Sequence, residues 1–169
     1  MRLASFEMIA KALDSGNVRY LVAGGLAVNA HGVLRFTKDL DVVVQLIPDN
    51  IARAFAALES LGYRPSVPVT LAQFSDKAQR QSWLEEKGMQ VLQFWSDLHR
   101  ETPIDMFVEE PFVFEEEYER ALLKPLRATV PVRFVSLPTL ITMKRHAGRP
   151  EDLSDIEQLS KVQKDIPDE

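Results

Sequence analysis

The chain has 169 residues, no cysteine, and a formal net charge of −5, with 46% hydrophobic and 27% charged residues. This length and composition favour one globular domain with a buried core and argue against a disordered chain. The lack of cysteine excludes disulfides, thiolate zinc sites and cysteine catalysis and fits a cytoplasmic protein, while the acidic balance argues against a broad surface for duplex nucleic acid.

Helix and strand patterns alternate through the first half of the chain. They predict, in chain order, a helix over 3–13, a strand over 18–23, a short helix over 26–31, a strand over 39–47, and a helix over 51–61 that Asp49 or Asn50 can cap. The helix over 3–13 lacks the uninterrupted apolar stretch of a signal peptide, and no apolar run approaches the length of a membrane span.

In the second half, helices become more frequent. The patterns predict an irregular segment over 63–69, partial helix over 71–87, strands over 89–95 and 104–108, a helix over 112–123 with an exposed acidic run at 115–117, a strand over 130–135, a helix over 136–147 capped by Ser136, and a last helix over 152–162. This order indicates an α/β or α+β fold: a small mixed sheet with flanking helices and a helical C-terminal end.

Two aspartates begin the clearest strand. Asp39 and Asp41 are two residues apart, and because side chains alternate along a strand they point to the same face. Neighbouring carboxylates repel each other, so solvent, a basic group or a cation must offset their charge. Mg²⁺ prefers oxygen ligands and is often held by one or two carboxylates together with substrate phosphates.

Asp105 is the single acid in another apolar strand pattern. If that strand lies beside the first, Asp105 joins Asp39 and Asp41. Three carboxylates on adjacent strands can hold two metal ions about 3.5–4 Å apart, a spacing common in phosphoryl-transfer sites. Asp39, Asp41 and Asp105 are therefore the predicted metal ligands and catalytic acids, with Mg²⁺ or Mn²⁺ as the cofactor.

A glycine pair, Gly24-Gly25, lies between a predicted strand and a predicted helix. Glycine lets the backbone approach a phosphate closely, and a helix N-terminus offers free N–H groups. Residues 26–38 leave room for a short helix and a return to the strand that carries Asp39. Gly24 and Gly25 are therefore predicted to contact a nucleotide.

Gly24-Gly25, Asp39-Leu40-Asp41 and the later Asp105 together resemble the signature of the polymerase-β-type nucleotidyltransferase superfamily. Many members have Gly-Ser where this chain has Gly-Gly. Residues 23–41 and 144–156 resemble more closely a small bacterial branch that includes AbiEii-type toxins and related nucleotidyltransferases. The resemblance implies a single nucleotidyltransferase-like domain over 1–169, in which a helical segment at about 136–162 packs on the site.

Further site residues follow from this resemblance. It implies nucleotide contacts from Arg35 and Thr37, which precede the acids, and from Lys144 and Arg149 in the C-terminal segment. Other residues fit structural roles and are not assigned to the site: Asp152 and Asp155 as acids at a helix start, His31 beside a glycine, and Trp83, Trp95 and the phenylalanines in the core.

The predicted activity is metal-dependent transfer of a nucleoside monophosphate from a nucleoside triphosphate to a hydroxyl acceptor, with release of pyrophosphate. The acceptor stays open between RNA, a protein side chain and a small molecule such as an antibiotic. The branch resemblance suggests a toxin with an antitoxin partner. A rival hypothesis is a nucleotide-binding or interaction module of the same fold that has lost turnover.

Overall fold

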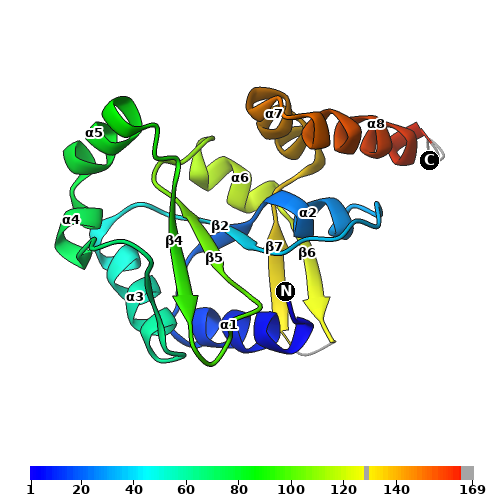
Figure 1. Ribbon diagram of the computed structural model, residues 1–169. Coiled ribbons are helices and arrows are strands. Elements are labelled where there is room, and N and C mark those ends of the chain that lie inside the picture. The colour runs from blue at the N-terminus through cyan, green and yellow to red at the C-terminus, as the bar shows by residue number, and fades with distance from the viewer. Residues whose placement is uncertain (128–129, 165–169) are drawn as a thin grey trace.

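The computed structural model describes residues 1–127 and 130–164 (Figure 1). The strands are β1 (Tyr20–Val22), β2 (Leu40–Val44), β3 (Tyr63–Pro65), β4 (Val91–Ser96), β5 (Ile104–Phe107), β6 (Leu122–Leu126) and β7 (Val130–Phe134). The helices are α1 (Leu3–Ser15), α2 (Gly24–Ala30), α3 (Pro48–Glu59), α4 (Leu71–Ser75), α5 (Lys77–Lys87), α6 (Phe114–Arg120), α7 (Leu137–Ala147) and α8 (Pro150–Lys164). None of these helices is both long and apolar enough to cross a membrane.

All seven strands form one mixed sheet in the order β3-β4-β5-β2-β1-β7-β6. Strand β2 lies in the middle, antiparallel to β1 and parallel to β5. Helices flank the sheet, and α7 and α8 lie together at one end of the molecule (Figure 1). The predicted class, a mixed sheet with flanking helices and a helical C-terminal end, is confirmed.

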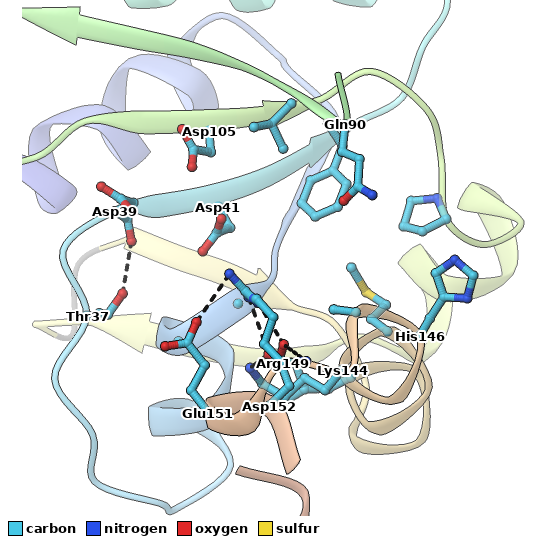
Figure 2. A pocket seen from close by; sticks show the side chains of 18 of the residues that line it. Thr37, Asp39, Asp41, Gln90, Asp105, Lys144, His146, Arg149, Glu151 and Asp152 are labelled. Atoms are coloured by element: carbon cyan, nitrogen blue, oxygen red, sulfur yellow. Dashed lines mark hydrogen bonds and ion pairs between the residues drawn. The ribbon is translucent and has the colours of Figure 1, made fainter. Parts of the chain in front are cut away.

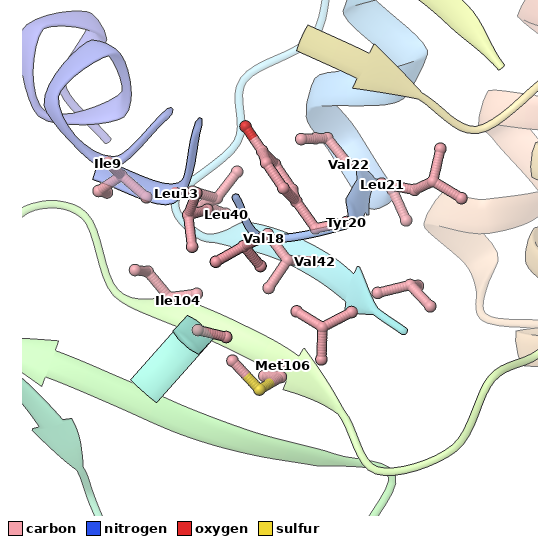
Figure 3. Packing of buried hydrophobic residues seen from close by; sticks show 14 of the residues in the cluster. Ile9, Leu13, Val18, Tyr20, Leu21, Val22, Leu40, Val42, Ile104 and Met106 are labelled. Carbon is pink, nitrogen blue, oxygen red and sulfur yellow. The ribbon is translucent and has the colours of Figure 1, made fainter. Parts of the chain in front are cut away.

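The core forms on the face of β2 opposite its aspartate. Leu40 and Val42 are buried and pair in register with Ile104 and Met106 of β5. Apolar side chains of α1, among them Ile9, pack against this face (Figure 3). Because side chains alternate along each strand, burying this face turns the intervening aspartates to the other face of the sheet.

Some apolar residues expected inside lie at the surface. Leu3 is 47% exposed at the start of α1, and Phe36 is 76% exposed in the loop before β2. Trp95 is only half-buried, with the guanidinium of Arg64 stacked 4.5 Å from its ring centroid, whereas Trp83 is buried as predicted. Periodicity identifies apolar side chains but does not show which of them tertiary packing covers.

The segment predicted to be irregular contains strand β3, so that prediction is wrong. Its Tyr63 is buried and donates a hydrogen bond from the phenol to the carbonyl of Thr102 at 2.7 Å. Pro65 is tolerated because β3 lies at the edge of the sheet. The partial helix predicted over 71–87 is confirmed as α4 and α5, which Asp76 separates by capping α5.

The predicted caps of α3 are also wrong. The helix begins earlier, at Pro48, so Asp49 and Asn50 lie inside its first turn and neither caps it. The buried amide of Asn50 instead accepts from the Arg19 N–H at 2.8 Å and donates to the carbonyls of Arg19 and Gln45 at 2.9 Å. It thereby ties the start of β1 to the end of β2.

The helix predicted over 112–123 is shorter than expected. It forms α6 and is followed by strand β6, which pairs antiparallel with β7. The residues of β6 are half-buried or exposed, and buried and exposed positions do not alternate along the strand. Its strand conformation depends on the partner that follows in the chain, which local periodicity cannot show.

Glu117, expected on an exposed acidic face, is fully buried. Its carboxylate accepts from the Ser136 N–H at 2.5 Å, the Thr139 hydroxyl at 2.6 Å and Arg120 Nε at 2.7 Å. The Ser136 hydroxyl, predicted to cap α7, makes no capping hydrogen bond. Glu117 performs that function, because it satisfies donors at the start of the helix.

Replacing Glu117 by alanine is therefore expected to cost about 2–4 kcal/mol of folding free energy, because three donors lose their acceptor. Urea denaturation measures the loss. Glu116→Ala is the matched control, since Glu116 is its exposed neighbour in the same helix. Equal stability losses for the two variants would contradict this role for Glu117.

Candidate active site

A cavity of about 1100 Å³ lies between the aspartate-bearing face of the sheet, the start of α2 and the α7–α8 pair. Figure 2 shows the carboxylates of β2 and β5 on one side and the side chains of α7 and α8 on the other. All nine site residues predicted from the sequence line this cavity: Gly24, Gly25, Arg35, Thr37, Asp39, Asp41, Asp105, Lys144 and Arg149.

The three acids come from two neighbouring strands. Asp41 and Asp105 are register partners in the parallel β2–β5 pair, and Asp39 lies one residue before β2. Their side chains share one face of the sheet and point into the same space (Figure 2). The expected meeting of Asp105 with the Asp39-x-Asp41 pair therefore occurs.

Burial and mutual repulsion change how these acids titrate. Burial, followed by the charges of Asp105 and Asp39, raises the pKa of Asp41 to about 7. Burial also raises the pKa of Asp105, although a hydrogen bond at 3.1 Å from Gln93 Nε2 opposes this change. The site therefore concentrates negative charge that the unliganded fold only partly offsets.

The glycine turn packs directly against Asp41. Gly24 has φ +62°, and a Cβ placed there would lie 2.0 Å from Asp41 Oδ2. A Cβ on Gly25 would lie 2.8 Å from the Cβ of Thr37. A side chain at Gly24 would therefore collide with Asp41, and one at Gly25 would collide with Thr37 in the loop before β2.

The basic residues of the C-terminal segment are held by carboxylates. Lys144 is only 5% exposed, and its Nζ lies 2.8 Å from Asp155 Oδ2 and 3.2 Å from Asp152 Oδ1. Arg149 has an exposed side chain whose Nε donates to Asp152 Oδ2 at 2.8 Å. Arg35, from the loop before β2, forms an ion pair with Asp155.

Asp152 and Asp155 are the residues that sequence reasoning missed. Asp152 does serve the start of α8, since it accepts the Arg149 N–H at 3.2 Å, but it also binds two basic side chains. Their spacing of three residues puts both acids on one helix face. That spacing, close in the sequence to the basic residues Lys144 and Arg149, was the signal that could have indicated ion pairs.

Thr37 has a local structural contact as well as a place in the cavity. Its hydroxyl donates to the carbonyl of Asp39 at 3.1 Å, which shapes the turn into β2. Several lining residues were not predicted to belong to the site. They are Phe36, Lys38, Gln90, Val91, Phe107, Glu109, Pro111, Leu140, Thr142, Met143, His146, Ala147, Glu151 and Asp152.

The donor set suits a hard cation, because carboxylate oxygens from adjacent strands face one cavity. Within residues 1–127 and 130–164, however, no group of three or more His, Cys, Asp or Glu side chains is arranged to hold a metal ion. Carboxylates alone therefore do not make a closed metal cage here. A magnesium site completed by substrate phosphates needs no such cage.

The sequence profile of the family described as "Nucleotidyltransferase of unknown function (DUF6036)" matches residues 2–166. The chain belongs to this family. The DUF6036 chain matches no curated protein.

Solved structures share the fold of this DUF6036 nucleotidyltransferase. The solution structure of the antibiotic-resistance factor ANT(2'')-Ia matches with a TM-score of 0.60 and 15% identity over 95% of this chain and 83% of that one. The crystal structure of ANT(2'')-Ia with adenylyl-2''-tobramycin matches with a TM-score of 0.58 and 16% identity over 95% of this chain and 92% of that one. The lincosamide antibiotic adenylyltransferase LnuA, with lincomycin bound, matches with a TM-score of 0.57 and 14% identity over 89% of this chain and 90% of that one.

Replacing Asp41 by asparagine is expected to stabilise the DUF6036 fold at about pH 8 by about 1–3 kcal/mol, because a buried charge is removed. Because the native pKa of about 7 lies above the ordinary 3.8, the native state keeps a proton between these two pH values that the unfolded chain has lost, and at about pH 8 Asp41 is ionised in both states. The stability that Asp41 contributes is complete below the unfolded pKa and falls as the pH rises through the native one. The advantage of Asp41→Asn should therefore shrink toward about pH 5.

Urea denaturation at the two pH values measures this difference. Asp14→Asn is the control, because Asp14 is exposed near the end of α1. A lower denaturation midpoint for Asp41→Asn than for wild type at about pH 8 would show that Asp41 does not carry an unfavourable buried charge.

Proposed function

We propose that this chain transfers a nucleoside monophosphate from a nucleoside triphosphate to a hydroxyl acceptor and releases pyrophosphate. The observation that carries the proposal is the meeting of Asp39, Asp41 and Asp105 on one face of the sheet, beside the Gly24-Gly25 turn. Family membership supports the class of reaction.

The reaction needs mainly positioning and charge stabilisation. The acceptor oxygen attacks the α-phosphorus, the bond to the oxygen that bridges the α- and β-phosphates breaks, and pyrophosphate leaves. The raised pKa of Asp105 makes its carboxylate a better proton acceptor, and it takes the hydroxyl proton. Gln93 holds that carboxylate through the 3.1 Å hydrogen bond.

Asp39, Asp41 and Asp105 would hold Mg²⁺ or Mn²⁺ together with phosphate oxygens. The bound cation would supply charge stabilisation to the phosphates and lower the pKa of the acceptor hydroxyl. Carboxylates otherwise repel a triphosphate, and burial already raises the pKa values of Asp41 and Asp105. The same negative charge that disfavours these ionised groups favours a divalent cation.

The positive side of the site lies across the cavity. Of the three predicted phosphate-binding cations, Arg149 has the most exposed side chain, at 64%, and it would meet the phosphates first. Arg35 and Lys144 add positive charge, and both form ion pairs with Asp155. The backbone at Gly24 and Gly25 would lie close to the phosphates, because no side chain intervenes.

The acceptor is a hydroxyl compound, and ANT(2'')-Ia and LnuA show that this fold can hold small antibiotics such as tobramycin and lincomycin. RNA and protein side chains are the other two acceptor classes. A toxin function with an antitoxin partner, and cytoplasmic action, stay predictions from the sequence.

Asp41→Asn and Asp105→Asn should each lower turnover by roughly a hundredfold or more, because each removes several kcal/mol of transition-state stabilisation. The assay is pyrophosphate release from each triphosphate, with mass spectrometry of the acceptors tested. Asp14→Asn should retain wild-type turnover, and circular dichroism should be the same for all. Near-wild-type activity of Asp41→Asn would overturn the assignment of the acids.

The same assay separates the proposal from its rival. A protein that binds triphosphates in the presence of magnesium but releases no pyrophosphate with any acceptor would be a nucleotide-binding module rather than an enzyme. Retention of all three acids in one cavity favours the enzyme.

A second measurement tests the coupling between metal and nucleotide. Magnesium and triphosphate together should raise the melting temperature by more than the sum of their separate effects, because each completes the binding site of the other. Asp39→Asn should reduce this joint effect more than Asp14→Asn does. Equal stabilisation by triphosphate with a chelator present would count against a metal-bridged site.

A further inference from the structure

The cavity has two ends with different chemistry. Figure 2 shows Thr37 and Asp39 toward one end and Gln90 and His146 toward the other, with Asp41 between them. The proposed reaction uses the first end and the middle. The second end has no role in it. Besides Gln90 and His146, it includes the lining residues that neighbour them on the sheet or on α7: Val91, Phe107 and Met143.

The sheet places this second end at a defined distance from the acids. Phe107 follows Asp105 by two residues on β5, so both point to the same face, roughly 7 Å apart along the strand. Val91 pairs with Phe107, and the N–H of Val108 donates to the carbonyl of Gln90 at 3.0 Å. Gln90 and Phe107 therefore lie beside each other, about the length of one ribose from Asp105.

The lining of this end does not suit phosphate. Among its described lining residues none is a lysine or arginine, and Glu109, which lines the cavity two residues after Phe107, is negatively charged. Arg35 and Lys38 lie in the loop before β2, and the charged groups of Lys144 and Arg149 are turned to Asp152 and Asp155 of α8. A triphosphate held by those cations would point its nucleoside, not its γ-phosphate, toward Phe107.

The chemistry of the second end suits a flat ring with a polar edge. The half-buried ring of Phe107 and the thioether of Met143 give apolar surface from the sheet and from α7. The amide of Gln90 offers both donors and an acceptor. Apolar walls with a few polar groups that set orientation are typical of small-molecule sites, and aromatic rings stack on such walls.

The acceptor has another route to Asp105. Gln93, the cross-strand partner of Asp105 on β4, is exposed, so the sheet face is open on that side. A hydroxyl compound approaching over Gln93 reaches Asp105 without passing Phe107. The two substrates would then meet at the acids from different directions, as an in-line transfer requires.

We propose that Phe107 and Gln90 form a nucleobase subsite, in which the Phe107 ring stacks on the base and the Gln90 amide reads its edge. This inference rests on the proposed function, since it assigns the base of the triphosphate that the acids act on. It makes Phe107 a general affinity determinant and Gln90 a determinant of which triphosphate is preferred.

The test compares the four nucleoside triphosphates with inorganic tripolyphosphate, each bound in the presence of magnesium and measured by calorimetry. Phe107→Ala should weaken all four nucleotides by about tenfold or more, on the scale of one lost base–aromatic stack. It should leave tripolyphosphate affinity unchanged, because that probe has no base. Phe107→Leu keeps apolar volume without the ring and should also weaken the nucleotides, which guards against a folding defect in the alanine variant.

Gln90→Ala should narrow the ratio between the best-bound and worst-bound triphosphates, again without changing tripolyphosphate binding. Gln81→Ala is the matched glutamine control, since Gln81 is exposed on α5 outside the cavity lining. Phe36→Ala tests the alternative position for the base, because Phe36 lines the same cavity in the loop before β2.

Wild-type nucleotide affinities in both Phe107 variants would overturn the subsite. A loss of nucleotide affinity confined to Phe36→Ala would also overturn it and would place the base at the loop before β2. A rise in the acceptor Michaelis constant alone in the Phe107 variants would assign this end to the acceptor instead. These failures leave nucleotide binding by the wild type intact. Failure of the proposed function itself would appear separately, as no binding of any triphosphate or of tripolyphosphate to the wild type.

Discussion

The parallel pairing of β2 with β5 sets Asp41 beside Asp105, and the repulsion between these carboxylates is the constraint on which the rest of the site depends. Burial is the largest cause that raises the pKa of Asp41 to about 7, and the charges of Asp105 and Asp39 add to it. A fold selected only for stability would not keep this arrangement, because it disfavours the ionised native state at neutral pH. In the proposed reaction, a cation bound by the carboxylates and the phosphates would offset this negative charge.

The opposite wall of the cavity is organised by ion pairs rather than by apolar packing. Asp155 binds Lys144 of α7 and Arg35 of the loop before β2, so a single carboxylate joins the C-terminal helices to the segment that carries Asp39 and Asp41. Asp152 sets the direction of Arg149. Buried ion pairs add little net stability, so their value here lies in fixing where positive charge stands relative to the acids.

Part of this site follows from local pattern. Asp39 and Asp41 share a face because a strand has a period of two, and strand and helix patterns locate the glycine pair at the change from strand to helix, where it forms the first two residues of α2. The roles of Asp152, Asp155 and Glu117 could not be read in the same way. Each is an acid near a helix start or on a charged helix. Asp155 and Glu117 bind partners many residues away, and Asp152 binds Lys144 of the preceding helix, so their burial depends on tertiary packing.

The sequence by itself determined the class of fold, the central strand with its aspartates and the order of most elements, since these depend on short-range periodicity and turn residues. Only the tertiary structure decided that 63–65 and 122–126 are strands, because their conformation comes from edge pairing with β4 and β7. It also decided which charges are exposed and which are buried against each other. Pairing and burial join residues distant along the chain, and a local pattern carries no information about the partner.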